Sequence, residues 1–144
     1  MILVDVNVLV YANRVDADDH HAFQSWLGDA LDGYEPVAVA DIVLSGVVRI
    51  LTNSRIYREP TNLADALAFV DALRSHPNVV QVAPGTRHWD IFRRLCTTAA
   101  AKGNLVPDAY LAAMAIEAGC EWITTDRDFA RFEGLRWRHP LARS

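Results

Sequence analysis

The sequence contains little that would cross-link a fold covalently or anchor it in a membrane. Its 144 residues include two cysteines, Cys96 and Cys120, and neither lies in a CxxC or Cys/His pattern. This spacing argues against both a disulfide framework and a zinc site. No apolar run approaches the roughly 18 residues that a membrane-spanning helix needs, and the N-terminus lacks the basic region and cleavage site of a secretory leader. We therefore expect a cytoplasmic protein with no membrane contact.

Lysine is almost absent, and basic charge does not dominate. Of 14 basic residues only Lys102 is a lysine, and the formal net charge is −4. An acidic chain does not bind nucleic acid with its whole surface. The arginines favour bidentate phosphate binding, although an Arg-rich codon preference explains them equally well. With 51% apolar and 22% charged residues, the chain has an ordinary globular composition, and we expect one domain over residues 1–144.

Short apolar runs alternate with stretches of helical periodicity. We predict strands at 2–4, 37–39, 79–82 and 122–124, an edge strand near 135–137, and helices over about 18–31, 41–51, 61–76, 88–95 and 108–118, with Asp41 and Thr61 as caps. In the helix 61–76 we expect Leu63, Leu67 and Val70 to face inward. Strands that alternate with helices pair in parallel through right-handed crossovers. The predicted fold is a three-layer α/β sandwich with a central parallel sheet of four to five strands.

Three carboxylates share one placement in this pattern. Asp5 directly follows the strand 2–4, Asp108 opens a helix after Pro107, and Asp126 follows the strand 122–124. Ligands of open α/β sheets bind beyond the carboxyl ends of the strands, so these acids converge if the first and fourth strands are neighbours. Converging carboxylates suit Mg²⁺ or Mn²⁺, which lowers the pKa of bound water and neutralises phosphodiester charge, as in a nuclease. Each Asp taken singly is also explained by turn formation or by the helix dipole.

Several nearby residues are candidates for supporting roles. Asn7 suits a hydrogen bond to a metal-bound water or an Asx-turn, and Thr125, with Thr124, suits orientation of a carboxylate or ordinary strand-end packing. Arg49 suits a phosphate contact or a surface ion pair.

Four stretches resemble the PIN-domain ribonucleases, specifically the VapC-type toxins of type II toxin–antitoxin systems. They are ILVDVNVLVYA at 2–12, VVRILTN at 47–53, PDAYLAAMAIEAG at 107–119 and TTDRDFARF at 124–132. The resemblance implies a PIN-like fold and a Mg²⁺- or Mn²⁺-dependent endoribonuclease that cleaves cellular RNA. It also implies a homodimer inhibited by a cognate antitoxin that binds operator DNA.

Carried over to this chain, the resemblance assigns the site acids. Asp5, Asp108 and Asp126 correspond to catalytic, metal-binding positions, and Asp128 to an additional acid. One position departs from the family pattern, because the usual Glu of the second helix is replaced near Gly46. Asp41 could supply the missing carboxylate. Without it the protein could be a catalytically weak or inactive PIN-fold binding module, which is the alternative to an active nuclease.

Two other folds with an acid after the first strand fit less well. A haloacid-dehalogenase-type phosphatase needs a second Asp where Asn7 stands, and a receiver domain needs paired acids there and a Lys near the end. For assembly, we expect apolar surface for a second subunit or an antitoxin segment on the stripe of Phe23, Trp26 and Leu27, or on the helix around Phe69.

Overall fold

Five short parallel strands form the centre of the molecule. The computed structural model describes residues 1–142. The strands are β1 (Ile2–Val4), β2 (Val37–Val39), β3 (Val79–Gln81), β4 (Glu121–Ile123) and β5 (Trp137–Arg138). They pair in the order β3-β2-β1-β4-β5, and every neighbouring pair is parallel. The predicted parallel sheet, including its edge strand, is confirmed.

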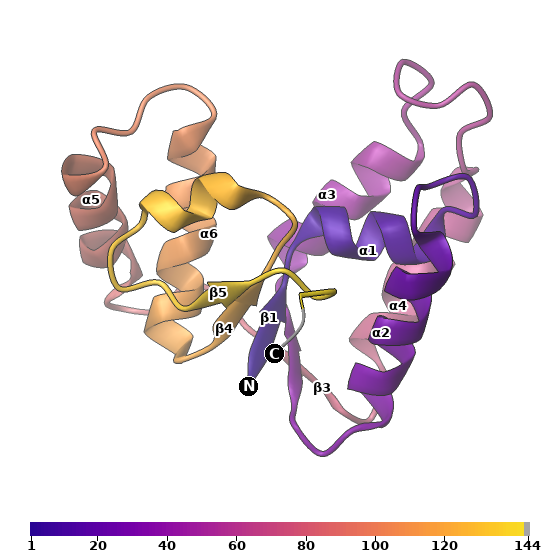
Figure 1. Ribbon diagram of the computed structural model, residues 1–144, viewed down its shortest axis with the longest axis horizontal. Helices are drawn as coiled ribbons and strands as arrows, with labels where there is room; N and C mark the ends of the chain where they lie inside the picture. The colour runs from indigo at the N-terminus through magenta and orange to yellow at the C-terminus, as the bar shows by residue number, and fades with distance from the viewer. Residues whose placement is uncertain (143–144) are drawn as a thin grey trace.

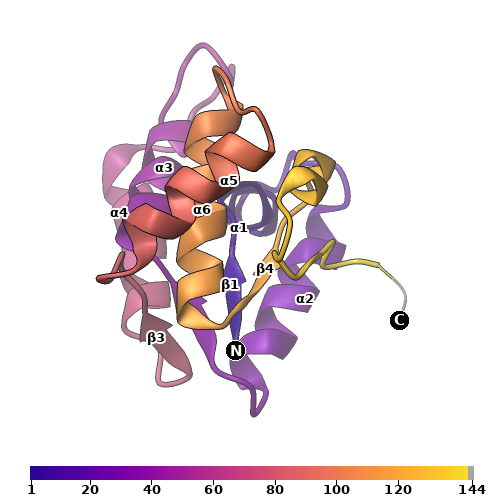
Figure 2. The same ribbon diagram turned by 90° about the vertical axis from the view of Figure 1, so that its left-hand side faces the viewer.

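Helices cover the sheet in two groups. They are α1 (Val6–Asn13), α2 (His20–Asp32), α3 (Asp41–Leu51), α4 (Leu63–Arg74), α5 (His88–Thr98) and α6 (Leu105–Ala118), with a short 3₁₀ helix η1 (Arg127–Arg131). Figure 1 shows α1 to α4 on one side of the strands and α5 with α6 on the other. In Figure 2, α5 and α6 face the viewer, with the strands behind them. The three layers match the predicted sandwich.

β1 lies at the point where the strand order reverses. The chain proceeds from β1 through β2 to β3 on one side of the sheet, then returns to place β4 on the other side of β1. All three β1 residues are buried, as expected for a strand covered on both faces. Crevices outside the carboxyl ends of strands at such a reversal bind ligands. The end of β1 beside the end of β4 is therefore where a site is expected.

One helix was missed by sequence analysis. α1 spans Val6–Asn13, where the β-branched residues Val6, Val8 and Val10 have low helix propensity. Asp5 caps it by accepting a hydrogen bond from the backbone N–H of Val6. Both predicted caps are also corrected. The cap of α4 is Asn62 and not Thr61, because the Asn62 side chain accepts from the Asp65 N–H. Asp41 is the first residue of α3, whose cap position is Ala40.

Two expectations about apolar faces are corrected by burial. Phe23 and Leu27 of α2 are buried in the core, so they leave no surface for a partner, and only Trp26 of that stripe is partly buried. Leu63 and Leu67 of α4, expected to face inward, are 59% and 43% exposed. The inward face of α4 is formed by buried residues Ala66, Val70 and Leu73.

Within residues 1–142, none of the helices has the length and apolarity required to cross a bilayer. Both cysteines are free thiols, as their spacing predicted.

Candidate active site

Asp5 is held at the junction of β1 and α1. Its side chain is only 5% exposed, and one oxygen, Oδ1, accepts the Val6 N–H at 2.7 Å. The other oxygen, Oδ2, accepts the Thr124 hydroxyl at 2.6 Å and the Asn7 amide at 3.2 Å. Burial raises the pKa of Asp5, and the Thr124 and Val6 hydrogen bonds oppose that rise. These donors stabilise the charged carboxylate and fix its direction.

Hydrogen bonds tie the end of β1 to the end of β4. Asn7 donates to the Thr124 hydroxyl at 3.3 Å and accepts the backbone N–H of Thr125 at 3.2 Å. The same Thr124 hydroxyl oxygen accepts the Asp126 N–H at 3.1 Å. The hydroxyl that contacts Asp5 thus belongs to fully buried Thr124, whereas Thr125 takes part through its backbone. Asn7 acts as the bridge between the two strands.

Asp126 and Asp128 lie just beyond this bridge. Asp126 caps η1 by accepting the Asp128 N–H at 2.9 Å. Asp126 is partly buried, and Asp128 is exposed. An acid at a 3₁₀-helix start is partly explained by its capping role, but Asp126 also acts electrostatically on Asp5.

Asp108 belongs to α6, and the charges of Asp5, Asp126 and Asp128 act on it. It lies in the first turn of α6 and is partly buried. Desolvation, followed by the negative charges of Asp126, Asp5 and Asp128, raises the pKa of Asp108 to about 6. The three neighbouring charges disfavour ionisation of Asp108, and a nearby cation would favour it. Asp5, Asp108, Asp126 and Asp128, called here the acid cluster, therefore share one electrostatic environment.

The acid cluster fits a hard divalent cation only with ligands from outside the chain. Within residues 1–142, no three Asp, Glu, His or Cys side chains converge tightly enough to form a ready-made metal cage. Mg²⁺ is usually held by one or two carboxylates, with water and substrate phosphates completing its coordination. Carboxylate oxygens are also the ligand type that Mg²⁺ and Mn²⁺ prefer. The donor set fits such an open site.

Asp41, which was considered as a replacement for the Glu expected in α3, forms an ion pair with Arg74. Asp41 is exposed and accepts two hydrogen bonds from Arg74, at 2.8 and 3.2 Å. This guanidinium lowers the pKa of Asp41. The charges that raise the pKa of Asp108 come from the acid cluster, and Asp41 is not among them. Asp41 is thus placed as an ion-pair partner at the start of α3.

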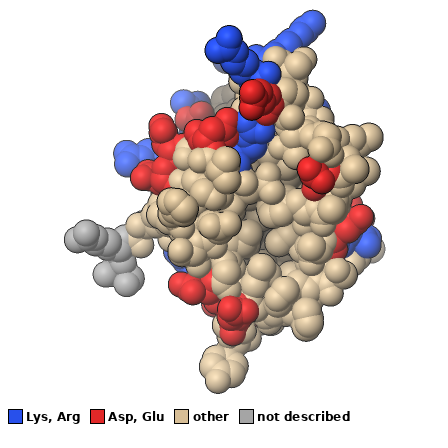
Figure 3. Space-filling view, turned by 90° about the vertical axis from the view of Figure 1, so that its right-hand side faces the viewer, with Lys and Arg blue, Asp and Glu red and all other residues tan. Residues whose placement is uncertain are grey.

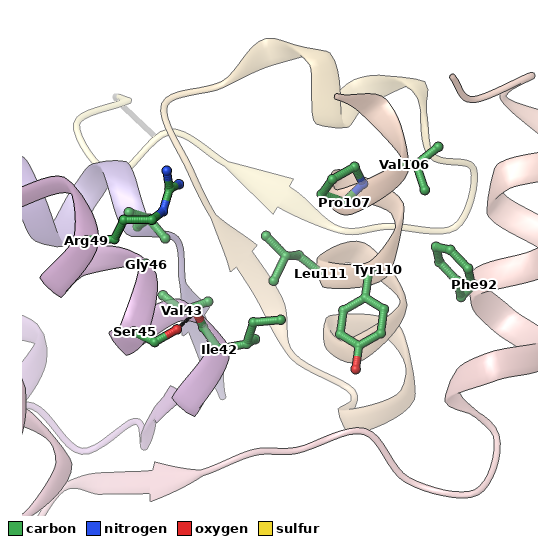
Figure 4. Close-up of a pocket in the computed structure, with 11 residues that line it drawn as sticks. Ile42, Val43, Ser45, Gly46, Arg49, Phe92, Val106, Pro107, Tyr110 and Leu111 are labelled. Atoms are coloured by element: carbon green, nitrogen blue, oxygen red, sulfur yellow. Dashed lines mark hydrogen bonds between the residues drawn. The ribbon is translucent and has the colours of Figure 1, made fainter. Parts of the chain in front are cut away.

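An apolar groove borders the acid cluster on the α3 side. It encloses about 460 Å³ and is lined by Val6, by Ile42, Val43, Ser45, Gly46 and Arg49 of α3, by Phe92 of α5, and by Val106, Pro107, Tyr110 and Leu111 of α6. Figure 4 shows the α3 residues facing those of α6 across this space. Val6 and Pro107 are the sequence neighbours of Asp5 and Asp108, so the groove begins beside both acids.

Gly46 contributes no side chain where α3 approaches α1. A Cβ added there would lie 3.1 Å from Cγ2 of Val6, closer than ordinary van der Waals contact. Arg49, one turn later, is exposed and forms no ion pair within residues 1–142. The groove wall thus carries a cation and no carboxylate.

Comparisons with known proteins agree with this architecture. Residues 2–135 match the PIN domain family model. The chain is 47% identical to ribonuclease VapC43 of Mycobacterium tuberculosis over 98% of this chain and 96% of that one. It is 41% identical to ribonuclease VapC25 of the same species, over 97% and 99% of the two chains.

Solved structures share the fold at lower sequence identity. VapBC2 from Rickettsia felis, solved bound to a DNA fragment from its promoter, superposes with a TM-score of 0.70 at 18% identity, covering 96% of this chain and 98% of that one. VapBC-1 from Haemophilus influenzae has the same TM-score at 16% identity, covering 99% and 100%. Together with the acids at the ends of β1 and β4, these matches show that the chain belongs to the PIN-domain family and, within it, to the VapC ribonucleases.

Proposed function

We propose that this protein is a Mg²⁺- or Mn²⁺-dependent endoribonuclease and the toxin of a toxin–antitoxin pair. The observation that carries the proposal is the gathering of acids from three separate elements, where burial and the charges of the other acids raise the pKa of Asp108 to about 6. Perturbed carboxylates gathered in a crevice at the reversal of strand order are typical of functional sites. The curated relatives are named ribonucleases, which supports RNA as the substrate class.

The chain's own residues have distinct roles in this proposal. Asp5, Asp108 and Asp126 would hold the divalent ion together with water and a substrate phosphate, with Asp128 as a further acid. When bound, the ion lowers the pKa of a water molecule and neutralises charge on the phosphodiester. Thr124 and Asn7 orient Asp5 by donating hydrogen bonds to its Oδ2. Outer hydrogen-bond partners of this kind set the direction of a ligand carboxylate. Arg49, which forms no ion pair with any residue of the described range 1–142, is available to a phosphate.

The family membership also supports proposals about assembly and cellular setting. The similar structures from Rickettsia felis and Haemophilus influenzae are VapBC complexes, which supports a cognate antitoxin as the protein partner. We propose that residues 1–144 act as one PIN-like domain in the cytoplasm, where the RNA is. We also propose a homodimer, which light scattering would test by a mass of two chains.

The test is cleavage of structured cellular RNA by purified protein in Mn²⁺. Asp5→Asn removes the charge and keeps a good helix cap, so we expect a folded protein without cleavage. Asp71→Asn, an exposed change on α4, is the matched control and keeps full activity. Cleavage that persists in Asp5→Asn indicates a contaminant and contradicts the assignment.

A catalytically inactive binding module remains the alternative because α3 carries Gly46 where the resemblance to PIN-domain ribonucleases implies a Glu. The same experiment separates the two functions. Wild-type protein that binds RNA or antitoxin but cleaves no cellular RNA in Mg²⁺ or Mn²⁺ favours the binding module.

A further inference from the structure

A second cavity opens from the β4 side of the acid cluster and is lined by aromatic rings. It encloses about 520 Å³, and its walls include Tyr11, Phe23, Tyr57, Thr125 and His139. Thr125 precedes Asp126, and its N–H binds Asn7. His139 follows β5, where the Arg138 carbonyl accepts the Thr124 N–H at 3.1 Å. The cavity therefore adjoins the ends of β4 and β5 next to the proposed site.

Helix α1 leads from the acid cluster to this cavity. Asn7 and Tyr11 are four residues apart, so they lie on the same face of the helix. Asn7 contacts Asp5, and the Tyr11 ring packs against the buried Phe23 ring with centroids 5.2 Å apart. Tyr11 remains 36% exposed. The Tyr11 ring thus faces the cavity about one helical turn from Asn7 and is held by its contact with Phe23.

The second tyrosine of the cavity is held in place by an arginine. The Arg14 guanidinium lies 3.9 Å from the centre of the Tyr57 ring. Arg14 is itself fixed by Asp16, through hydrogen bonds of 2.8 and 2.6 Å, and by the Glu59 carbonyl at 2.9 Å. Burial raises the pKa of Tyr57, with smaller effects from neighbours that include Tyr11. Both rings are pre-ordered, so stacking on them requires little further ordering.

The polar groups of this cavity are mainly hydrogen-bond acceptors. Asp18 and Asp19 line it, and both are exposed and without an ion pair in the part of the chain described. Asp19 makes no side-chain capping bond to α2. The charge of Asp16 is matched by Arg14. Ionised carboxylates only accept hydrogen bonds, so they select a ligand edge that presents adjacent N–H donors.

We propose that this cavity is a nucleobase subsite that receives an unpaired guanine of the RNA, next to the bond to be cleaved. Single-stranded RNA is read by stacking of splayed bases on aromatic rings and by hydrogen bonds to their Watson–Crick edges. Among the four bases, guanine alone presents adjacent ring N–H and amino donors on that edge. The proposal rests on the proposed function for the identity of RNA as the ligand.

Phosphates would lie outside the acidic wall of the cavity. Arg55 and Arg58 flank Tyr57 in the loop after α3, and both are exposed without an ion pair within residues 1–142. Figure 3 shows a face of the molecule on which basic side chains stand at one tip, beside a group of acidic ones. An RNA strand can therefore keep its backbone near arginines while one base enters among the carboxylates.

The test is binding of four unstructured RNA oligonucleotides, a nine-nucleotide U strand and three versions with G, A or C at the centre. Fluorescence anisotropy is measured in EDTA on an Asp126→Asn background, so cleavage does not contribute. We expect the G strand to bind about tenfold more tightly than the U strand. Tyr11→Ala removes the stacking ring and should weaken G-strand binding about tenfold, since stacking contributes roughly 1–3 kcal/mol per base.

Matched variants isolate each part of the subsite. Tyr34→Ala removes a fully exposed tyrosine outside this cavity and should leave all four affinities unchanged. The double variant Asp18→Ala/Asp19→Gly, whose glycine suits the left-handed backbone of residue 19, should abolish the preference for G over U. Equal binding of the four strands by the parent protein, or an unchanged G-to-U ratio in the double variant, overturns the proposal.

Cleavage mapping keeps this inference separate from the proposed function. RNA cleaved without dependence on a neighbouring G leaves the nuclease intact and overturns the subsite. Guanine-dependent binding that is lost in Tyr11→Ala, in a protein that cleaves no RNA, supports the subsite and contradicts the nuclease.

Discussion

The two sides of Asp5 are built differently. On the β4 side, Thr124, Asn7 and Asp126 form a continuous hydrogen-bond network around buried charge. On the α3 side, Val6 and Gly46 meet in an apolar groove with Arg49 at its edge. The first side is rigid and negative, whereas the second is open and carries no acid. The positions of Asp5 and Asp126 therefore depend on residues at the end of β4. We expect substitutions on the β4 side to change cleavage more than substitutions on the α3 side.

The largest effect is expected from removing an acid. Asp108→Asn removes the carboxylate whose pKa is most affected by the cluster, and we expect RNA cleavage to fall by at least about 100-fold, as for loss of a metal-ion ligand. Initial rates on one RNA at saturating Mn²⁺ measure it. Asp90→Asn, an exposed acid in the first turn of α5, is the control. Equal rates for Asp108→Asn and wild type would remove Asp108 from the site.

A smaller loss is expected from removing one hydroxyl of the network. Thr124→Val keeps the side-chain shape but leaves Asp5 Oδ2 and the Asp126 N–H without their shared partner. We expect a loss of 10–100-fold in cleavage or Mn²⁺ affinity, typical of groups that orient a ligand. Thr97→Val removes an exposed hydroxyl of α5 that donates to the Arg93 carbonyl, and activity should remain near wild type. Similar losses in both variants would show that the hydroxyl of Thr124 has no special role.

The burial of Asp108 and the repulsion from the other acids predict a pH-dependent stability. The pKa of Asp108 is about 6 in the folded chain, above its ordinary value of 3.8. Between these values the folded state binds more protons than the unfolded state, so stability falls as pH rises through this window. In EDTA at pH 7.5, Asp108→Asn should raise the melting temperature by about 2–4 °C, as expected for roughly 1 kcal/mol in a chain of this size.

Calorimetry or circular dichroism at pH 4 and pH 7.5 checks this sign. At pH 4 the two proteins should melt within about 1 °C of each other, because Asp108 is then protonated in the folded state. A variant that is less stable than wild type at pH 7.5 would contradict the electrostatic interpretation.

The smallest effect is expected on the open side. Gly46→Ala gains up to about 1 kcal/mol of helix propensity but places a Cβ 3.1 Å from Cγ2 of Val6. The free energy of unfolding should therefore change by less than about 1 kcal/mol, with little change in cleavage. Val6→Ala removes the close contact, so Gly46→Ala should be more favourable in that background. A denaturant double-mutant cycle measures the difference, and additivity within error would contradict the contact.

Sequence reasoning identified the parts of the site that depend on strand ends. A short run of branched residues predicts a buried strand, and an acid directly after it lies at the sheet edge, so Asp5 and Asp126 could be placed. Pairing of β1 with β4 then brought them together. The assignment of these acids to catalysis stays a prediction, since only the experiments above test it.

Other features depend on contacts between distant residues. Asp41 pairs with Arg74, 33 positions away, and no local pattern reveals that pairing. The choice between adjacent Thr124 and Thr125 depends on which hydroxyl faces Asp5. Sequence analysis missed helix α1 because its valines have low helix propensity. Asp5, a favoured N-cap residue directly before it, could have indicated the helix. The exposure of Leu63 and Leu67 shows that apolar periodicity alone does not settle which face of α4 is inward.

Asp5 both begins the first helix and supplies a charge to the proposed site. Asparagine performs the first task and fails at the second, and it differs from aspartate by a single nucleotide in the codon. A population of cells harmed by this protein would therefore have a short mutational route to a harmless version that still folds. Such a version would retain its outer surface and continue to occupy whatever partner normally restrains the active form.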